Sequence, residues 1–259
     1  MAISPANAAP ENPPVSRDWF REWFDSPYYH KLYFERNEKE AADFIDRLLS
    51  LLKPPAGSSL LDVACGRGRH ARILAGYGYD VTGIDLAPHS IAFANQFANE
   101  HLRFFVHDMR QLLCANCFHY AFNFFTSFGY FSTHREHVNA IRMVSTALRP
   151  KGVFVLDYLN ASYAQEHLVP KETKTIDGVT YAITRWCDGI HFYKKMEISD
   201  ANLQKPLEYT EKVAMISARD FESLFSSNGL EIQQRYGNYL LELYDPKHSP
   251  RLILIAQKK

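Results

Sequence analysis

Residues 61–70 read Leu-Asp-Val-Ala-Cys-Gly-Arg-Gly-Arg-His, and this stretch decides the fold. An apolar run typical of a buried strand passes through a turn with two glycines into a helical pattern that begins at Arg69. Glycine lacks a Cβ atom, so backbone N–H groups in such a turn can approach a ligand closely, at the positive end of the next helix. Gly66 and Gly68, followed by Ala71, also fit the dinucleotide-binding fingerprint. The stretch therefore predicts a ligand-binding turn after the first strand of an α/β sheet.

Strand and helix patterns alternate from residue 60 onward, which predicts a mostly parallel sheet with helices on both faces. The first five strands are expected at residues 60–64, 81–84, 102–106, 118–125 and 153–156. The helices between them are expected at residues 69–76, 88–100 and 134–148. A helix capped by Ser217 and two further strands, at residues 231–236 and 251–256, complete a seven-stranded sheet.

The N-terminal part of the chain shows two different patterns. Residues 1–15 contain several prolines among small polar residues, which predicts a disordered tail. Residues 16–56 are expected to form a helical cap, with a turn at residues 26–29. Aromatic side chains recur at helical spacing near the start of this cap, so a short helix is predicted that either packs on the core or covers a ligand. These side chains are Trp19, Phe20, Trp23 and Phe24.

Residues 161–216 interrupt the alternation and predict an antiparallel insertion, or lid, after the fifth strand. Strand patterns at residues 181–187 and 190–198 flank Asp188-Gly189, a dipeptide that suits a type I′ hairpin turn. A third strand is expected at residues 207–216. The main domain is then predicted to comprise residues 57–160 and 217–259.

Three acidic residues stand where the first three strands meet their loops. Asp62 lies within the first strand, where its carboxylate can order the glycine turn or meet an ammonium group through water. Asp85 ends the second strand, where a carboxylate can accept hydrogen bonds from both hydroxyls of a ribose. Asp108 follows the third strand, where it can accept from an adenine amino group while Met109 packs on the ring. A nicotinamide enzyme has no particular need for this third group.

At these residues the chain resembles the class I S-adenosylmethionine-dependent methyltransferases. Residues 62–68 look like the glycine-rich first motif of that family, Asp85 matches its ribose-binding position, and Asp108-Met109 matches its adenine-binding motif. Ala64 and Lys151 replace two common glycines. The resemblance extends over about residues 57–160, and over 217–259 by topology, and within the superfamily it points to a group of small bacterial methyltransferases. It implies a Rossmann-like, mostly parallel seven-stranded sheet with a helical cap and an antiparallel insertion.

The resemblance implies S-adenosylmethionine as the cofactor and in-line transfer of its methyl group. Tyr28, Tyr33 and Arg36 are expected to close the pocket from the N-terminal side, with Arg36 available for a carboxylate. Tyr130 and Tyr158 follow the fourth and fifth strands, and we expect them to orient the acceptor as catalytic residues. The cofactor-binding residues are expected to be Asp62, Ala64, Cys65, Gly66, Gly68, Asp85, Leu86, Asp108, Met109, Phe125, Tyr28, Tyr33 and Arg36.

Composition narrows the class of partner. Lysine plus arginine and aspartate plus glutamate both number 29, so the net charge is zero and a small-molecule acceptor is favoured over a nucleic acid. No apolar run is long enough to span a membrane and no secretory signal opens the chain, so a cytoplasmic protein is expected. Cys114-x-x-Cys117 has no second pair beside it, so no metal site is predicted.

Two other functions remain open at this point. A nicotinamide-dependent oxidoreductase would use the same glycine turn, and a non-catalytic sensor would bind S-adenosylmethionine without turnover. The sequence predicts neither the atom that is methylated nor the oligomeric state.

Overall fold

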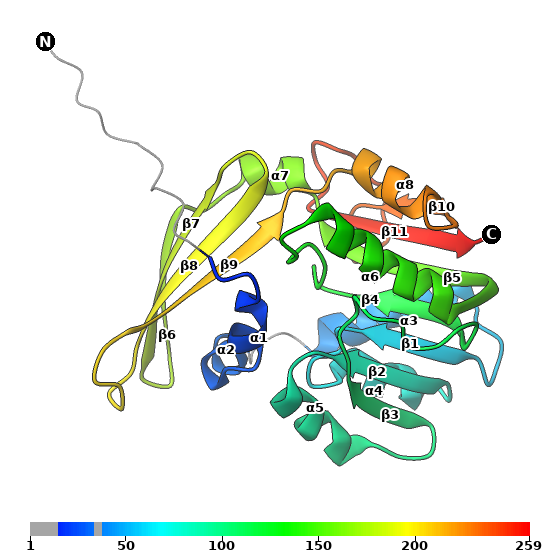
Figure 1. Cartoon of the computed structure of the whole chain (residues 1–259), viewed down its shortest axis with the longest axis horizontal. Helices are drawn as coiled ribbons and strands as arrows, with labels where there is room; N and C mark the ends of the chain where they lie inside the picture. The colour runs from blue at the N-terminus through cyan, green and yellow to red at the C-terminus, as the bar shows by residue number, and fades with distance from the viewer. Residues whose placement is uncertain (1–14, 34–37) are drawn as a thin grey trace, which may run out of the picture.

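The structure is a computed structural model, and it describes residues 15–33 and 38–259. The predicted tail therefore lies almost wholly outside the described residues, and so does Arg36. Two sheets make up most of the molecule, and a small helical unit lies between them (Figure 1).

The larger sheet has seven strands in the order β10-β11-β5-β4-β1-β2-β3 (Figure 1). The strand β1 pairs in parallel with both β2 and β4, and β11 runs antiparallel to both of its neighbours. This arrangement confirms the predicted mostly parallel sheet. The strands are β1 Ser59–Val63, β2 Asp80–Asp85, β3 Leu102–Val106, β4 Phe118–Asn123, β5 Leu148–Leu159, β10 Leu230–Tyr236 and β11 Arg251–Lys258.

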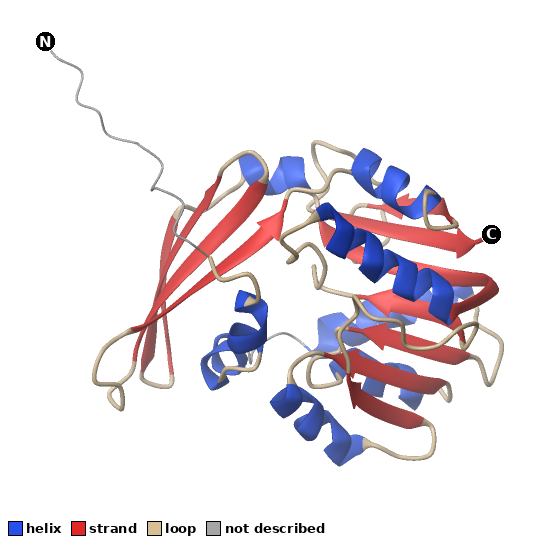
Figure 2. Ribbon diagram, in the orientation of Figure 1, coloured by secondary structure: helices blue, strands red, loops and turns tan. Residues whose placement is uncertain are grey.

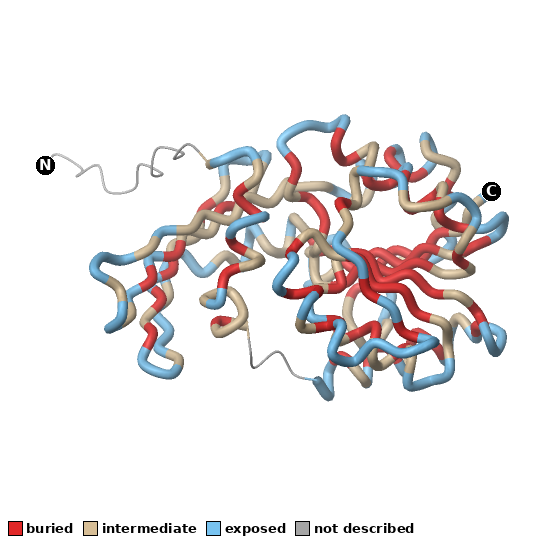
Figure 3. Tube along the Cα trace, turned by 60° about the horizontal axis from the view of Figure 1, so that its bottom comes forward, coloured by how far each residue is buried: buried red, intermediate tan, exposed pale blue. Residues whose placement is uncertain are grey.

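Helices cover both faces of this sheet, because successive strand side chains point to opposite sides. In β1, Leu60 packs with α3, α4 and α5 on one face, whereas Leu61 packs with α6 and α8 on the other. The buried residues concentrate along the central strands (Figure 3). The helices are α3 Glu38–Leu52, α4 Arg69–Gly76, α5 Pro88–Ala94, α6 His134–Ala147 and α8 Ala218–Ser226. The expected helix at residues 88–100 is shorter than predicted, because a 3₁₀ turn at Asn95–Phe97 follows α5.

The smaller sheet is antiparallel and corresponds to the predicted insertion, but it has four strands where three were expected. Their order is β6-β7-β8-β9. The strands are β6 Lys171–Ile176, β7 Val179–Cys187, β8 His191–Ser199 and β9 Leu207–Ala214. A short helix, α7 Ala161–Glu166, connects the end of β5 to this sheet and was not predicted. We call β6–β9 the lid sheet.

The type I′ turn was predicted in the wrong hairpin. That turn needs a positive φ at both central residues. Between β7 and β8 only Gly189 has a positive φ, and the Asp188 carboxylate instead accepts hydrogen bonds from the next backbone N–H groups. Between β6 and β7, Asp177 and Gly178 form a two-residue connection with φ values of 46° and 78°. The sequence therefore did indicate β6, the strand that was not predicted, through a second Asp-Gly pair.

The helical unit between the two sheets consists of α1 Trp19–Phe24 and α2 Pro27–Leu32 (Figure 2). The predicted turn at residues 26–29 is wrong, because Ser26 caps α2. Its hydroxyl accepts from the backbone N–H of Tyr28 at 3.2 Å, and Pro27 occupies the first helical position. We call residues 15–33 the cap.

Candidate active site

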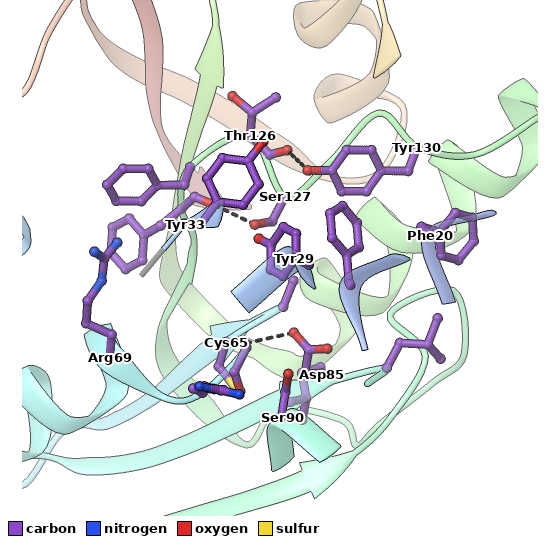
Figure 4. A pocket seen from close by; sticks show the side chains of 18 of the residues that line it. Phe20, Tyr29, Tyr33, Cys65, Arg69, Asp85, Ser90, Thr126, Ser127 and Tyr130 are labelled. Atoms are coloured by element: carbon purple, nitrogen blue, oxygen red, sulfur yellow. Dashed lines mark hydrogen bonds between the residues drawn. The ribbon is translucent and has the colours of Figure 1, made fainter. Parts of the chain in front are cut away.

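A cavity of about 510 Å³ lies at the carboxyl ends of the parallel strands. Loops that follow β1, β2 and β4 form its floor, and side chains of the cap form its roof. Figure 4 shows Tyr29 and Tyr33 of the cap across this space from Cys65 and Asp85. Ligands of open α/β sheets bind at this edge. The cavity is therefore where the sequence analysis places the cofactor, and we call it the cofactor cavity.

The turn after β1 has the backbone conformation that its glycines allow. Gly66 and Gly68 have φ values of 54° and 76°, in the left-handed region. A Cβ added to Gly66 would meet no atom within 4 Å, so this side of the turn is open. A Cβ on Gly68 would lie 2.6 Å from the ring of Phe104, so this glycine is required by packing. Ala64 has a φ of 59° without being glycine, and this conformation is strained.

Asp85 holds the glycine turn in place from the end of β2. Its Oδ2 accepts from the backbone N–H of Gly66 at 2.7 Å, and its Oδ1 accepts from that of Ala87 at 2.8 Å. Burial raises the pKa of the carboxyl group, while these two hydrogen bonds oppose the rise. A carboxylate has about four lone-pair positions, so further donors can still be accepted from the cavity. The residue fits the predicted ribose contact.

Asp62 lies behind the turn and does not line the cavity. It is fully buried, and its Oδ2 has no hydrogen-bond partner among the described residues. Burial, together with the nearby charge of Asp85, raises the pKa of Asp62 to about 8. The residue therefore has no direct contact with the cofactor cavity.

Asp108 lines the cavity, but its carboxylate already has strong partners. Arg110 binds it through Nε at 3.0 Å and Nη2 at 2.7 Å, and Arg21 of the cap approaches Oδ2 at 3.2 Å. Burial opposes ionisation, yet the hydrogen bonds from Arg110 keep the pKa of Asp108 below its usual value. These bonds compete with a bond to an adenine amino group, so the adenine contact stays a prediction.

The loop after β4 is built around a buried ion pair that the sequence analysis missed. Phe125 and Thr126 both have a φ of 58°. The backbone N–H of Phe125 donates to Asp157 Oδ2 at 2.9 Å, and Arg251 bridges Asp157 at 2.8 Å and the hydroxyl of Thr126 at 3.0 Å. The hydroxyl of Tyr130 donates to the carbonyl oxygen of Thr126 (Figure 4). An arginine at the start of the last strand gives no local signal of this role.

The structure brings most of the predicted site residues to one cavity. Those that line it are Ala64, Cys65, Gly66, Asp85, Leu86, Asp108, Met109, Phe125, Tyr33 and Tyr130. Gly68 lies beneath the turn, against Phe104.

Two tyrosines are not where they were expected. Tyr28 turns toward the lid sheet, where its hydroxyl donates to Asp200 at 3.3 Å and its carbonyl accepts from Tyr181. Tyr158 is fully buried, and its hydroxyl donates to the carbonyl of Ala214 at 2.5 Å. The reason is that β5 continues to Leu159 instead of ending near residue 156, so Tyr158 lies inside a strand rather than in a loop beside the cavity. The structure therefore does not support direct contact of either residue with a ligand.

The cap supplies further cavity residues. Phe20 and Phe24, which the helical spacing predicted either to pack on the core or to cover a ligand, line the cavity. Tyr29 and His30 line it as well, and the sequence analysis gave these two residues no role. His30 lies 3.3 Å from the hydroxyl of Ser90. Burial, with the nearby charge of Arg67, lowers the pKa of His30 to about 4, so its ring is neutral near pH 7.

The cap is bonded to both halves of the molecule. Toward the cofactor side, Asp25 binds His89 at 2.6 Å, in addition to the Arg21–Asp108 pair. Toward the lid sheet, the indole N–H of Trp23 donates to Glu211 at 2.7 Å. The cap therefore closes the cavity and links the two sheets.

Other features of the described residues bear on the class of site. In that part of the chain no group of three or more His, Cys, Asp or Glu side chains is arranged to hold a metal ion. Cys114 and Cys117 are joined by a disulfide, which was not predicted. No helix within residues 15–33 and 38–259 has the length and apolar character needed to cross a membrane.

A glycine turn after β1 and a carboxylate at the end of β2, beneath a cavity at the sheet edge, define an α/β protein that binds a nucleoside cofactor. The family model described as "Methyltransferase domain" matches residues 33–235. The chain therefore belongs to this family, as a class I S-adenosylmethionine-dependent methyltransferase with S-adenosylmethionine as its cofactor.

Similar proteins agree with this assignment. The dTDP-3-amino-3,4,6-trideoxy-alpha-D-glucopyranose N,N-dimethyltransferase of Streptomyces venezuelae is 25% identical over 207 residues, which cover 76% of this chain and 85% of that protein. An S-adenosylmethionine-dependent methyltransferase from Clostridium acetobutylicum superposes with a TM-score of 0.74 at 18% identity, covering 89% and 96% of the two chains. The amino pentose methyltransferase CalS10 from Micromonospora echinaspora, with S-adenosylmethionine bound, gives 0.67 at 23% identity, covering 90% and 98%.

Proposed function

We propose that the protein transfers the methyl group of S-adenosylmethionine to a small-molecule acceptor by in-line displacement. The observation that carries the proposal is the covered cavity at the carboxyl ends of β1, β2 and β4, with Asp85 and the open side of Gly66 on its floor. Aromatic side chains of the cap form its roof. A cavity enclosed in this way excludes water and suits a small acceptor better than a polymer.

The residues of the chain bind and align the cofactor and the acceptor, and they do not themselves react with either. The cofactor supplies an activated methyl group, so alignment and exclusion of water are the main tasks left to the protein. We propose that Asp85 accepts the ribose hydroxyls and that Met109 packs on the adenine. Gly66 has no side chain, so the rest of the cofactor can lie against the backbone of the turn. Tyr130 positions the loop at Thr126 through its hydroxyl, because that hydroxyl donates to the Thr126 carbonyl.

The similar proteins favour a nitrogen acceptor on a sugar. The Streptomyces venezuelae protein is named as an N,N-dimethyltransferase of an amino sugar nucleotide, and CalS10 is described as an amino pentose methyltransferase. The lid sheet supports a small acceptor, because a second cavity of about 570 Å³ lies beneath it. We propose that residues 161–216 act as the lid over this acceptor. A cytoplasmic location stays a prediction.

Methyl-labelled S-adenosylmethionine tests the proposal directly. The protein is incubated with dTDP-3-amino-3,4,6-trideoxy-alpha-D-glucopyranose, with its 3-hydroxy counterpart and with fractions of cell metabolites, and both the label and S-adenosylhomocysteine are followed. We expect labelled small-molecule product in stoichiometric amount with S-adenosylhomocysteine. Tight cofactor binding without turnover on any fraction would instead support a sensor. Binding of NADH in place of S-adenosylmethionine would support the oxidoreductase.

A further inference from the structure

The second cavity adjoins the cofactor cavity. It lies between the lid sheet, α7 and the end of β5. Among residues 15–33 and 38–259, those that line both cavities are Leu159, Glu211 and Val213. Leu159 and Val213 are apolar, so Glu211 supplies the charge among these described residues. A molecule that enters beneath the lid sheet therefore meets this carboxylate where it meets the cofactor cavity.

Glu211 is held at the junction through one of its two oxygens. Its Oε1 accepts from the indole N–H of Trp23 at 2.7 Å and from the hydroxyl of Tyr33 at 3.3 Å, and Lys194 Nζ lies 3.8 Å from it. In the part of the chain that the structure describes, none of these contacts uses Oε2. The side chain is only 15% exposed, so its position is well fixed. One oxygen orients the carboxylate, and the other can accept from a ligand.

The charge of Lys194 affects what can bind beside Glu211. The ammonium group donates to the hydroxyl of Tyr33 and lines the second cavity. A carboxylate attracts any N–H or O–H donor, whereas a nearby ammonium group repels a second cation. The pair together therefore favours a donor that is neutral when it binds. A neutral amine meets this condition, and it also has the lone pair that a methyl transfer needs.

We propose that Glu211 binds the nucleophilic amine of the acceptor at the junction of the two cavities, through Oε2, and aligns it with the methyl group. This inference rests on the proposed function. In the transfer, the nitrogen lone pair forms the new bond to the methyl carbon as the carbon–sulfur bond breaks and its electron pair stays on sulfur. The nitrogen becomes a cation and releases one proton, which Glu211 accepts and passes to water. Glu211 is thus an acceptor-binding residue supplied by the lid sheet.

Sinefungin allows a test before the acceptor is known. It carries an amine in place of the transferred methyl group, whereas S-adenosylhomocysteine carries nothing there, so the ratio of their dissociation constants reports on charge at the acceptor side. Glu211→Gln keeps an oxygen for Trp23 but removes the negative charge. We expect it to weaken sinefungin at least fivefold relative to S-adenosylhomocysteine in calorimetry. Lys194→Met removes the opposing charge, so we expect it to strengthen sinefungin relative to S-adenosylhomocysteine.

Glu208→Gln is the matched control, because Glu208 is on the same strand but exposed and paired with Lys195 at 3.1 Å. We expect it to leave the ratio unchanged. If Glu211→Gln weakens both ligands equally, or neither, Glu211 only anchors the cap and the inference is wrong. If Lys194→Met changes the ratio in the same direction as Glu211→Gln, the effect is not one of charge and the inference is again wrong. Failure of the unaltered protein to bind S-adenosylhomocysteine would instead overturn the proposed function.

Discussion

The two sheets hold their ligand-facing carboxylates in opposite ways. In the parallel sheet, backbone N–H groups of Gly66 and Ala87 orient Asp85, and both lie within 19 residues of it along the chain. In the lid sheet, side chains of Trp23 and Tyr33 orient Glu211, and these are 188 and 178 residues away. A short motif can encode the first arrangement. The second exists only after the whole chain has folded.

This difference explains which half of the site carries a recognisable signature. Backbone contacts depend on chain conformation, which glycines and strand ends reveal in the sequence. Side-chain contacts across the fold leave no such pattern. A substitution in the parallel-sheet half of the site should therefore have effects that a matching substitution in the lid-sheet half does not have.

The two sheets should differ most in how much stability they lose when an ion pair is broken. Arg251→Met removes the partner of Asp157, which is fully buried, and leaves a carboxylate without its main counter-charge. We expect the free energy of unfolding to fall by about 3 kcal/mol. Arg185→Met breaks the Arg185–Glu172 pair of the lid sheet, which is partly exposed, and should cost less than about 1 kcal/mol. Urea titrations of both variants test this, and equal losses would contradict it.

The next effect is a pH dependence that arises from Asp62 of the parallel sheet. The pKa of Asp62 is raised to about 8 in the folded chain, chiefly by burial, whereas an unfolded aspartate has about 3.9. Between these pH values the folded state holds a proton that the unfolded state has lost. The contribution of Asp62 to the free energy of unfolding therefore falls as the pH rises from about 4 to about 8, whereas His30 and His137, whose pKa values burial lowers to about 4, contribute in the opposite direction below about pH 6.5. Asp62→Asn should remove the slope that Asp62 gives between pH 6.5 and 8, and be more stable than the unaltered protein at pH 8.

Urea titrations at pH 5, 6.5 and 8, without ligand, measure that slope. Asn is nearly the same size as Asp, so packing is kept. Glu172→Gln is the matched control in the lid sheet, where the carboxylate is partly exposed and already paired. It should leave the slope between pH 5 and 8 unchanged. Retention of the full slope in Asp62→Asn would assign the pH dependence to another group.

Substitutions of Asp85 and of Glu211 should have different effects on the affinity for the cofactor product. Asp85→Ala removes the carboxylate that holds Gly66 and that we propose accepts the ribose hydroxyls, so we expect S-adenosylhomocysteine to bind at least tenfold more weakly, about 1.4 kcal/mol. Glu211→Gln should change the same affinity by less than threefold, because the ligand proposed for Glu211 is the acceptor. Calorimetry on both variants decides the point. Normal affinity in Asp85→Ala would remove the residue from the cofactor site.

The smallest effect concerns two residues with positive φ. Ala64→Gly should raise the free energy of unfolding by about 0.5–1 kcal/mol, because alanine is strained at a φ of 59° and glycine is not. Asp177 of the lid sheet has a φ of 46°, but aspartate tolerates this region better. Asp177→Gly should therefore change stability less than Ala64→Gly. A loss of stability in Ala64→Gly would show that the alanine methyl group has a packing role that outweighs the strain.

The parallel sheet and the residues that line its end of the cavity were predictable because their signals are local. Alternating strand and helix patterns gave all seven strands, and the glycine turn with Asp85 marked the cavity floor. The errors have physical causes. Tyr158 was misplaced because nothing in the sequence shows that β5 extends to Leu159. Arg251 and Glu211 were missed because their partners lie far away along the chain, so that only the folded structure brings them together.

The link from the cap to the lid sheet has a consequence for how the protein is made. Trp23 precedes its partner Glu211 by 188 residues, so at roughly 10 residues per second the cap leaves the ribosome on the order of 20 s before that partner exists. Until then the indole of Trp23 lacks its hydrogen-bond acceptor, although Trp19 and Phe20 can already pack on Tyr130 and Phe131. We expect the cap to close in a late step, because contacts so distant along the chain are slow to form. Of the three tryptophans, Trp23 packs on Tyr209 and Trp186 on Tyr193 of the lid sheet, whereas Trp19 packs on Tyr130 beside the parallel sheet. Tryptophan fluorescence of a Trp19→Phe variant during refolding therefore reports the formation of the lid sheet and its contact with the cap.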